Sequence, residues 1–251
     1  MIRRLFLVLI FVLVAIVSAV AFTPLGFLLN RAGLDAYGVG WSQVDGTLGQ
    51  GRIDGLYVGA QPVGDVTLTL RPLSLLRLQP TYDVQWSGSG GRGRAVISVL
   101  SRRELSASDI RLQHNLAVIE GLALPIRAMG GQLQVRDGLV QLTRTGCTQA
   151  SGTLSTDILA RAAGQYGRTF GQFEGPLSCD AGQFILAMKA RSEEADAVDF
   201  NAQASLLGSV NARVSVQTPS AEIGLALSQF GFQRRGDLLV YDYNRNPGDV
   251  R

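Results

Sequence analysis

Hydrophobic residues at every second position restrict the fold of this sequence more than any other feature. In residues 66–70 aliphatic side chains alternate with threonines, and Tyr82, Val84 and Trp86 alternate with polar neighbours. Such alternation places an apolar and a polar face on an extended strand, which is typical of a half-buried sheet. The sequence therefore predicts a mainly β protein, an antiparallel sheet of consecutive hairpins with few short helices.

Residues 130–143 predict the clearest local unit. Here Asp137-Gly138 has the composition of a two-residue type I′ turn. With that turn, Val135 would lie opposite Val140 and the apolar side chains would share one face. We therefore expect a hairpin centred on this dipeptide.

Further segments predict one more hairpin and two helices. Residues 200–216 alternate on either side of Gly208, which predicts two strands joined by a turn. A helix is expected to begin near Pro219 and to reach about Phe230, because proline is favoured in the first helical turn. A further turn of helix is expected in residues 157–163.

The N-terminal residues are expected to form a membrane anchor. Residues 5–22 contain Ser18 as their only polar member and follow Arg3 and Arg4. As a helix they would cover roughly 27 Å, near the thickness of the hydrocarbon core of a bilayer. Because the flanking arginines favour the cytoplasmic side, the rest of the chain should lie outside the cytoplasm.

A cleaved signal peptide is the alternative, since Ala19 and Ala21 have the spacing of a cleavage site. The apolar run is longer than most signal segments, so we favour a retained anchor. The expected domains are an anchor in residues 1–23, a juxtamembrane linker in residues 24–40 and an exported β-rich domain in residues 41–251.

Cys147 and Cys179 are the only cysteines. An even count in an oxidising compartment favours one disulfide, and two buried free thiols are the alternative.

The residues provide no arrangement typical of catalysis or metal binding. His114 is the only histidine, and we interpret it as structural or surface-exposed. Residues 88–93 match G-x-G-x-x-G, but a β-branched segment follows where dinucleotide binding requires a helix, so a hairpin loop is expected. The acidic residues Glu193, Glu194 and Asp196 are interpreted as a solvated turn. The net charge of +3, without a basic stripe, does not indicate nucleic-acid binding. No catalytic, cofactor-binding or metal-binding residue is therefore predicted.

Several segments also occur in a characteristic order. They are Trp41, the segment GTLGQGRIDGLYVG at 46–59, LTLRPLSLL at 68–76, LALPIRAMGGQLQVRDGLVQL at 122–142, the two cysteine segments, and LSQFGFQRRGDLLVYDYNR at 227–245. In this order they resemble the type II secretion system protein N family.

The resemblance implies a non-enzymatic accessory component of the type II secretion system. Such a component would be a single-pass protein of the inner membrane with its main domain in the periplasm. It would support the machine that exports folded proteins across the outer membrane, with other components of that machine as partners and no cofactor. The paired cysteines of the family would correspond to Cys147 and Cys179, as a structural disulfide.

The segment RPLSLL also resembles AsmA-like envelope proteins, which implies lipid handling or membrane assembly as the alternative function. Leu73, Leu75, Leu76 and Leu78 would either close a core or line an opening that contacts lipid, and we favour the core. An envelope enzyme that depends on His114 is a third interpretation.

Overall fold

The structure is a computed structural model. It describes residue 18 and residues 22–31, 33–59, 61–101, 103–119, 124–164, 166–206 and 208–246. Most of the predicted anchor, residues 1–23, lies outside this described part. Within it, no helix combines the length and the apolar character needed to cross a bilayer. The chain divides into a first unit, Met1–Arg102, and a second unit, Arg103–Arg251.

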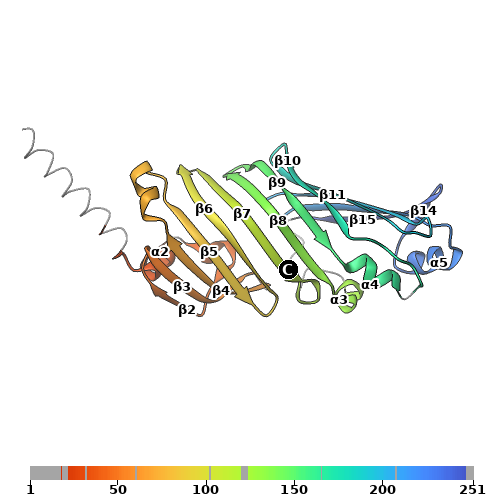
Figure 1. Ribbon diagram of the computed structural model, residues 1–251, viewed down its shortest axis with the longest axis horizontal. Coiled ribbons are helices and arrows are strands. Elements are labelled where there is room, and N and C mark those ends of the chain that lie inside the picture. Colours follow the sequence, from red (N-terminus) through yellow and green to blue (C-terminus); the bar gives the residue numbers. More distant parts are fainter. Residues whose placement is uncertain are drawn as a thin grey trace, which may run out of the picture. The chain divides into compact units, whose positions relative to one another are not determined.

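The first unit is an antiparallel sheet with three short helical segments (Figure 1). Its elements are α2 (Leu25–Arg31), the 3₁₀-helix η1 (Leu34–Tyr37), β1 (Val39–Gly40), β2 (Gln43–Gly46), β3 (Gln50–Val58), β4 (Gln61–Leu70), the 3₁₀-helix η2 (Pro72–Arg77), β5 (Thr81–Gly88) and β6 (Gly91–Ser101). The strand order is β1-β3-β4-β5-β6, and β2 also pairs with β3. Consecutive strands from β3 to β6 are therefore neighbours, as expected for hairpins.

The second unit is also an antiparallel sheet with short helical segments, and it has more strands (Figure 1). Its elements are β7 (Glu104–Asn115), the 3₁₀-helix η3 (Leu116–Val118), α3 (Leu124–Met129), β8 (Gln132–Thr143), β9 (Gly146–Thr156), α4 (Ile158–Gly164), β10 (Phe173–Asp180), β11 (Gln183–Arg191), β12 (Ala197–Ala204), β13 (Val210–Gln217), α5 (Ala221–Gln229), β14 (Gln233–Arg235) and β15 (Leu238–Arg245). Their order is β7-β8-β9-β10-β11-β12-β13-β15-β14. The predicted antiparallel, mainly β architecture with few helices is confirmed.

The core of the first unit lies under α2. Leu25 of α2 is buried with Ile53 of β3, Val66 of β4 and Val84 of β5. The period-two pattern explains this arrangement, because Val66 is buried while its neighbour Thr67 is exposed. Leu25 belongs to the segment expected to be a linker, and it contributes to this core with 5% of its surface exposed.

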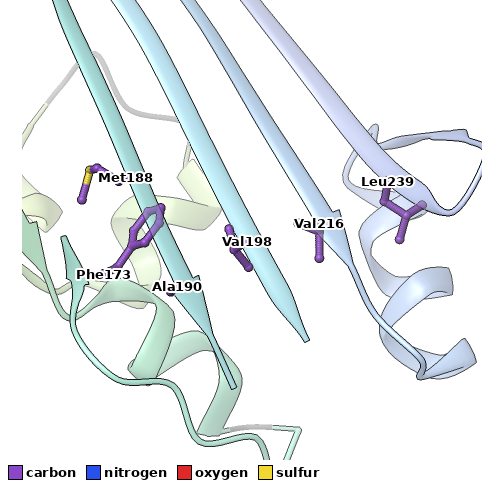
Figure 2. Close-up of a cluster of buried hydrophobic side chains, with 6 residues drawn as sticks. All are labelled: Phe173, Met188, Ala190, Val198, Val216 and Leu239. Carbon is purple, nitrogen blue, oxygen red and sulfur yellow. The ribbon is translucent and has the colours of Figure 1, made fainter. Parts of the chain in front are cut away.

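The core of the second unit crosses five strands, β10 to β13 and β15 (Figure 2). Its buried members are Phe173, Met188, Ala190, Val198, Val216 and Leu239. Leu159 of α4 and Leu227 of α5 pack against this cluster. Burying a large apolar side chain stabilises a fold by roughly 1.5–3 kcal/mol. Each of the two helices therefore stabilises the second unit by covering part of this core.

The hairpin predicted in residues 130–143 is wrong. These residues contribute one continuous strand, β8, in which Val135 lies opposite Leu112 of β7 and Leu154 of β9. Asp137 adopts a left-handed φ of 49°, at a shift of register in both ladders. An Asp-Gly pair tolerates this conformation in a bulge as well as in a turn. Because β8 pairs with a strand on each side, the Asp-Gly pair forms a bulge and not a turn.

The other predicted hairpins and helices are confirmed, although α5 begins at Ala221 and Pro219 precedes its N-cap instead of lying in the first helical turn. Gly88 pairs with Gly91 in the β5–β6 hairpin, and Ala204 pairs with Val210 in the β12–β13 hairpin. The predicted helices are α4 and α5. The N-cap of α5 is Ser220, whose Oγ accepts a hydrogen bond from the backbone N–H of Ile223 at 3.4 Å.

Candidate interaction surfaces

The polar residues singled out in the sequence do not converge on one site. His114 lies on β7, half-buried, opposite Leu133 of β8. Among the described residues, no group of three or more His, Cys, Asp or Glu side chains is arranged to hold a metal ion. The G-x-G-x-x-G segment is the β5–β6 hairpin. These residues therefore form no common site.

Cys147 and Cys179 form the predicted disulfide. Cys147 of β9 is 4% exposed, and its Cα lies 6.1 Å from that of Cys179 on β10. The continuous ladder between these strands runs only from Thr153 to Thr156 on the β9 side. The disulfide thus joins the two strands outside that ladder, which is a structural role.

The sequence suggested that the acidic turn is solvated, but the structure shows that part of it is buried. Asp196 is 3% exposed, and its Oδ2 lies 3.1 Å from Nε of Arg168 and accepts a hydrogen bond from Oγ of Ser192 at 3.1 Å. A carboxylate of Glu194 accepts from the N–H of Thr169 at 3.3 Å, and this bond is the main cause that lowers the pKa of Glu194. These contacts fasten the segment after α4 to the β11–β12 turn, so the cluster is structural.

Three leucines of η2 and its C-cap lie on the surface. Leu73, Leu76 and Leu78, which we call the leucine corner, are 77%, 66% and 87% exposed. Leu75 is half-buried. The preference for a closed core is therefore wrong for the three leucines of the corner. The alternation in the flanking strands does not predict this exposure, because the period-two pattern does not extend into the short connection between them.

The local chain path explains why η2 projects. Oγ of Ser74 donates to the carbonyl oxygen of Arg71 at 2.6 Å and accepts from the N–H of Thr81 at 3.0 Å. The side chain of Arg71 is itself held by Asp83, with Nε 2.9 Å from Oδ2. These bonds close the base of the connection between β4 and β5. The leucines are left on its outer side, where they are available to an apolar partner.

The second unit has an open sheet edge at β15. Residues 239–245 of the strand pair with β13 on one side, but β14 covers only Leu238 to Val240 on the other. No described residue pairs with residues 241–245 on that second side, and we call this stretch the open edge segment. Unpaired main-chain groups on such an edge accept an added strand from a partner.

Charges beside the open edge segment are paired within the sheet. Oδ1 of Asp242 lies 2.6 Å from Nε of Arg213, and Oδ2 lies 3.2 Å from a terminal nitrogen of Arg235. The hydrogen bond from Arg213 is the main cause that lowers the pKa of Asp242. Tyr243 is 38% exposed. An incoming strand would therefore meet a polar edge with an excess of positive charge, since Asp242 is the partner of two arginines and Arg245 lies in the same segment. No sequence signal marks this edge, because strand order is not encoded locally.

Comparison with known proteins identifies one family. The sequence model of type II secretion system (T2SS), protein N, matches residues 37–239. This range reaches from the end of η1 into β15, and so includes strands of both units. No curated protein and no solved structure shows significant similarity to the chain.

Proposed function

The chain belongs to the type II secretion system protein N family, and from this premise we propose that it is a non-enzymatic accessory component of that system. It supports the assembly or function of the machine that exports folded proteins across the outer membrane. The family match over residues 37–239 is the observation that carries the proposal. Because this match includes both units, the role belongs to the β-rich domain as a whole.

The proposed location is the inner membrane, with the β-rich domain in the periplasm. The apolar run in residues 5–22 behind Arg3 and Arg4 supports a single-pass anchor with this orientation. The Cys147–Cys179 disulfide supports an oxidising compartment for the domain. Residues 1–23 would then hold the domain at the membrane in which the secretion machine is assembled.

The proposed mode of action is docking of another secretion component on the open edge segment. A strand added beside residues 241–245 would satisfy main-chain groups that have no partner among the described residues. Main-chain pairing gives affinity, while Tyr243 and its neighbours would give selectivity. This mechanism needs no reacting group, in keeping with a supporting role.

Site-specific photo-crosslinking in the native host tests this docking. A photoreactive amino acid would replace Tyr243 in the full chain, and crosslinked partners would be identified by mass spectrometry. Asn201 is the matched control, because it is exposed but lies on β12, which pairs with β11 and β13 along its length. We expect a secretion component at position 243 and none at position 201.

Two results would contradict the proposal. Equal crosslinking at positions 201 and 243 would remove the open edge segment as the docking site. Copurification of stoichiometric phospholipid without any secretion component would instead support the AsmA-like alternative of lipid handling.

A further inference from the structure

We propose that the leucine corner of η2 inserts into the surface of the bilayer that holds the N-terminal anchor. The inference rests on the proposed inner-membrane anchor and adds a second membrane contact to it. This contact would fix the orientation of the first unit against the lipid, beyond a simple tether.

The chain enters the first unit at the same end of the sheet as the leucine corner. The carbonyl oxygen of Thr23 accepts a hydrogen bond from the N–H of Leu48 at 2.9 Å, and Gly49 accepts one from the N–H of Leu70 at 2.9 Å. Leu70 ends β4, and η2 begins two residues later. Hydrogen bonds through residues 48–49 thus place residue 23 and η2 at the same end of the strands.

This placement identifies the partner of the corner. The apolar sequence of residues 5–22 ends directly before Thr23. If that sequence spans the bilayer, Thr23 lies at the lipid surface, and so does the end of the sheet that carries Leu73, Leu76 and Leu78. Phe22, 75% exposed, also lies at this entry point.

The backbone of Leu78 gives a second, independent indication. Leu78 caps the end of η2 with a left-handed φ of 54° while its side chain is 87% exposed. Glycine or asparagine is favoured in this conformation, because other L-residues adopt it at a steric cost. Packing within the fold does not account for a leucine here. A strained residue of this kind is a reason to look for a function outside the fold.

The charge around the corner fits a lipid surface. Residues 66–82 contain no acidic residue. Arg77, at the end of η2, is exposed and forms no ion pair with any residue that the structure describes. Apolar side chains beside a cation bind bilayer surfaces by entering the boundary between headgroups and acyl chains while the cation stays near anionic headgroups.

The test measures the depth of a fluorophore in the full-length protein reconstituted in vesicles of phosphatidylethanolamine and phosphatidylglycerol. Leu76→Cys would carry an environment-sensitive dye, and the described chain has no free cysteine to compete for labelling. Part of the phosphatidylethanolamine would be replaced by a lipid with a nitroxide quencher near the top of its acyl chain. Apolar groups at a bilayer surface reach about 5–10 Å below the headgroups, within range of this quencher.

Ser89→Cys is the matched control. Ser89 is exposed in the β5–β6 hairpin, at the opposite end of the first unit. β5 spans eight residues, which separates that end from the corner by about 27 Å at 3.4 Å per residue. We expect blue-shifted, strongly quenched emission at position 76 and unquenched emission at position 89.

The outcomes separate the inference from the proposed function. Protein that floats with the vesicles but shows no quenching at position 76 would overturn the inference and leave the anchor intact. Protein that does not float would overturn both the anchor and the inference. In either case, crosslinking to secretion components remains a separate measure of the proposed function.

Leu78→Asn provides a second measurement. Asparagine tolerates the left-handed backbone, so we expect an unchanged or higher denaturation midpoint together with weaker quenching of the dye at position 76. A lower midpoint would mean that Leu78 stabilises the fold, and the argument from strain would fail.

Discussion

Cys147 of β9 and Cys179 of β10 are joined by a disulfide, with Cα atoms 6.1 Å apart, outside the continuous ladder of these two strands. Backbone pairing holds β9 to β10 at Thr153 to Thr156, and the covalent bond holds them nearer the other end. The second unit therefore uses one cross-link where its hydrogen-bonded ladder is incomplete.

Replacing both cysteines by alanine is expected to lower the free energy of unfolding by about 3–4 kcal/mol, because the bond closes a long loop in the unfolded chain. The sequence separation is 32 residues. Denaturant unfolding of the purified full chain, followed by circular dichroism, measures this change. Adding reductant to the unaltered protein should produce a similar loss. A loss below about 1 kcal/mol in both would contradict the loop-entropy argument.

Arg168→Met is expected to lower the free energy of unfolding by about 2–3 kcal/mol, because it leaves the carboxylate of Asp196 buried without its cation. The side chains of Arg168 and Asp196 are 23% and 3% exposed, and partial exposure of the arginine reduces the effect. Arg213→Met is the control, since its ion pair with Asp242 is largely exposed and should have little effect. Equal losses in the two variants would show that burial of the pair is unimportant.

Gly175→Ala is expected to cost about 1–3 kcal/mol by overpacking. A Cβ at this position of β10 would collide with the backbone carbonyl of Ala187 on β11, which has no room to move within the sheet. Gly171→Ala lies four residues earlier, with no atom within 4 Å of the added Cβ, and should change stability by less than about 0.5 kcal/mol. Thermal or denaturant unfolding of both variants measures the difference. Indistinguishable midpoints would contradict the close approach of β10 and β11.

Asp157 should contribute to the acid sensitivity of the second unit. Burial raises the pKa of Asp157, but hydrogen bonds from the N–H of Gln132 and from Arg161, at 2.6 Å and 2.8 Å, outweigh it and lower the pKa overall. A carboxyl whose pKa is lower in the folded state stabilises fully above its unfolded pKa, near 4, and loses that contribution as the pH falls through the folded value.

Asp157→Asn keeps a hydrogen-bond acceptor but removes the titrating charge. We therefore expect a smaller fall in unfolding free energy below about pH 4 than in the unaltered protein. Unfolding curves across that pH range measure the slope, with Asp237→Asn at an exposed turn as the control. An identical slope for Asp157→Asn and the unaltered protein would contradict the assignment.

Much of the sheet could be predicted from local pattern. The alternation around Val66 and Val84 reports which side chains face a core, because successive residues of a strand point to opposite faces. The hairpin at Gly88 and the helix before Phe230 follow from local turn and capping preferences as well. The even number of cysteines, in a chain expected to be exported, predicted the disulfide.

Other features depend on neighbours that are distant in sequence. Asp137 and Gly138 fit a turn and a bulge equally well, and only the pairing of β8 with both β7 and β9 selects the bulge. Asp196 has the local sequence of a solvated turn, and it is buried because Arg168, from another segment, lies against it.

The sequence by itself determined the strands, their apolar faces, the family and the disulfide, because these depend on local periodicity and on the order of segments along the chain. Only the tertiary structure decided which strand forms an edge and which leucines remain uncovered. The open edge segment and the leucine corner are defined by what does not pack against them. That depends on where every other part of the described chain is placed, which no local pattern specifies.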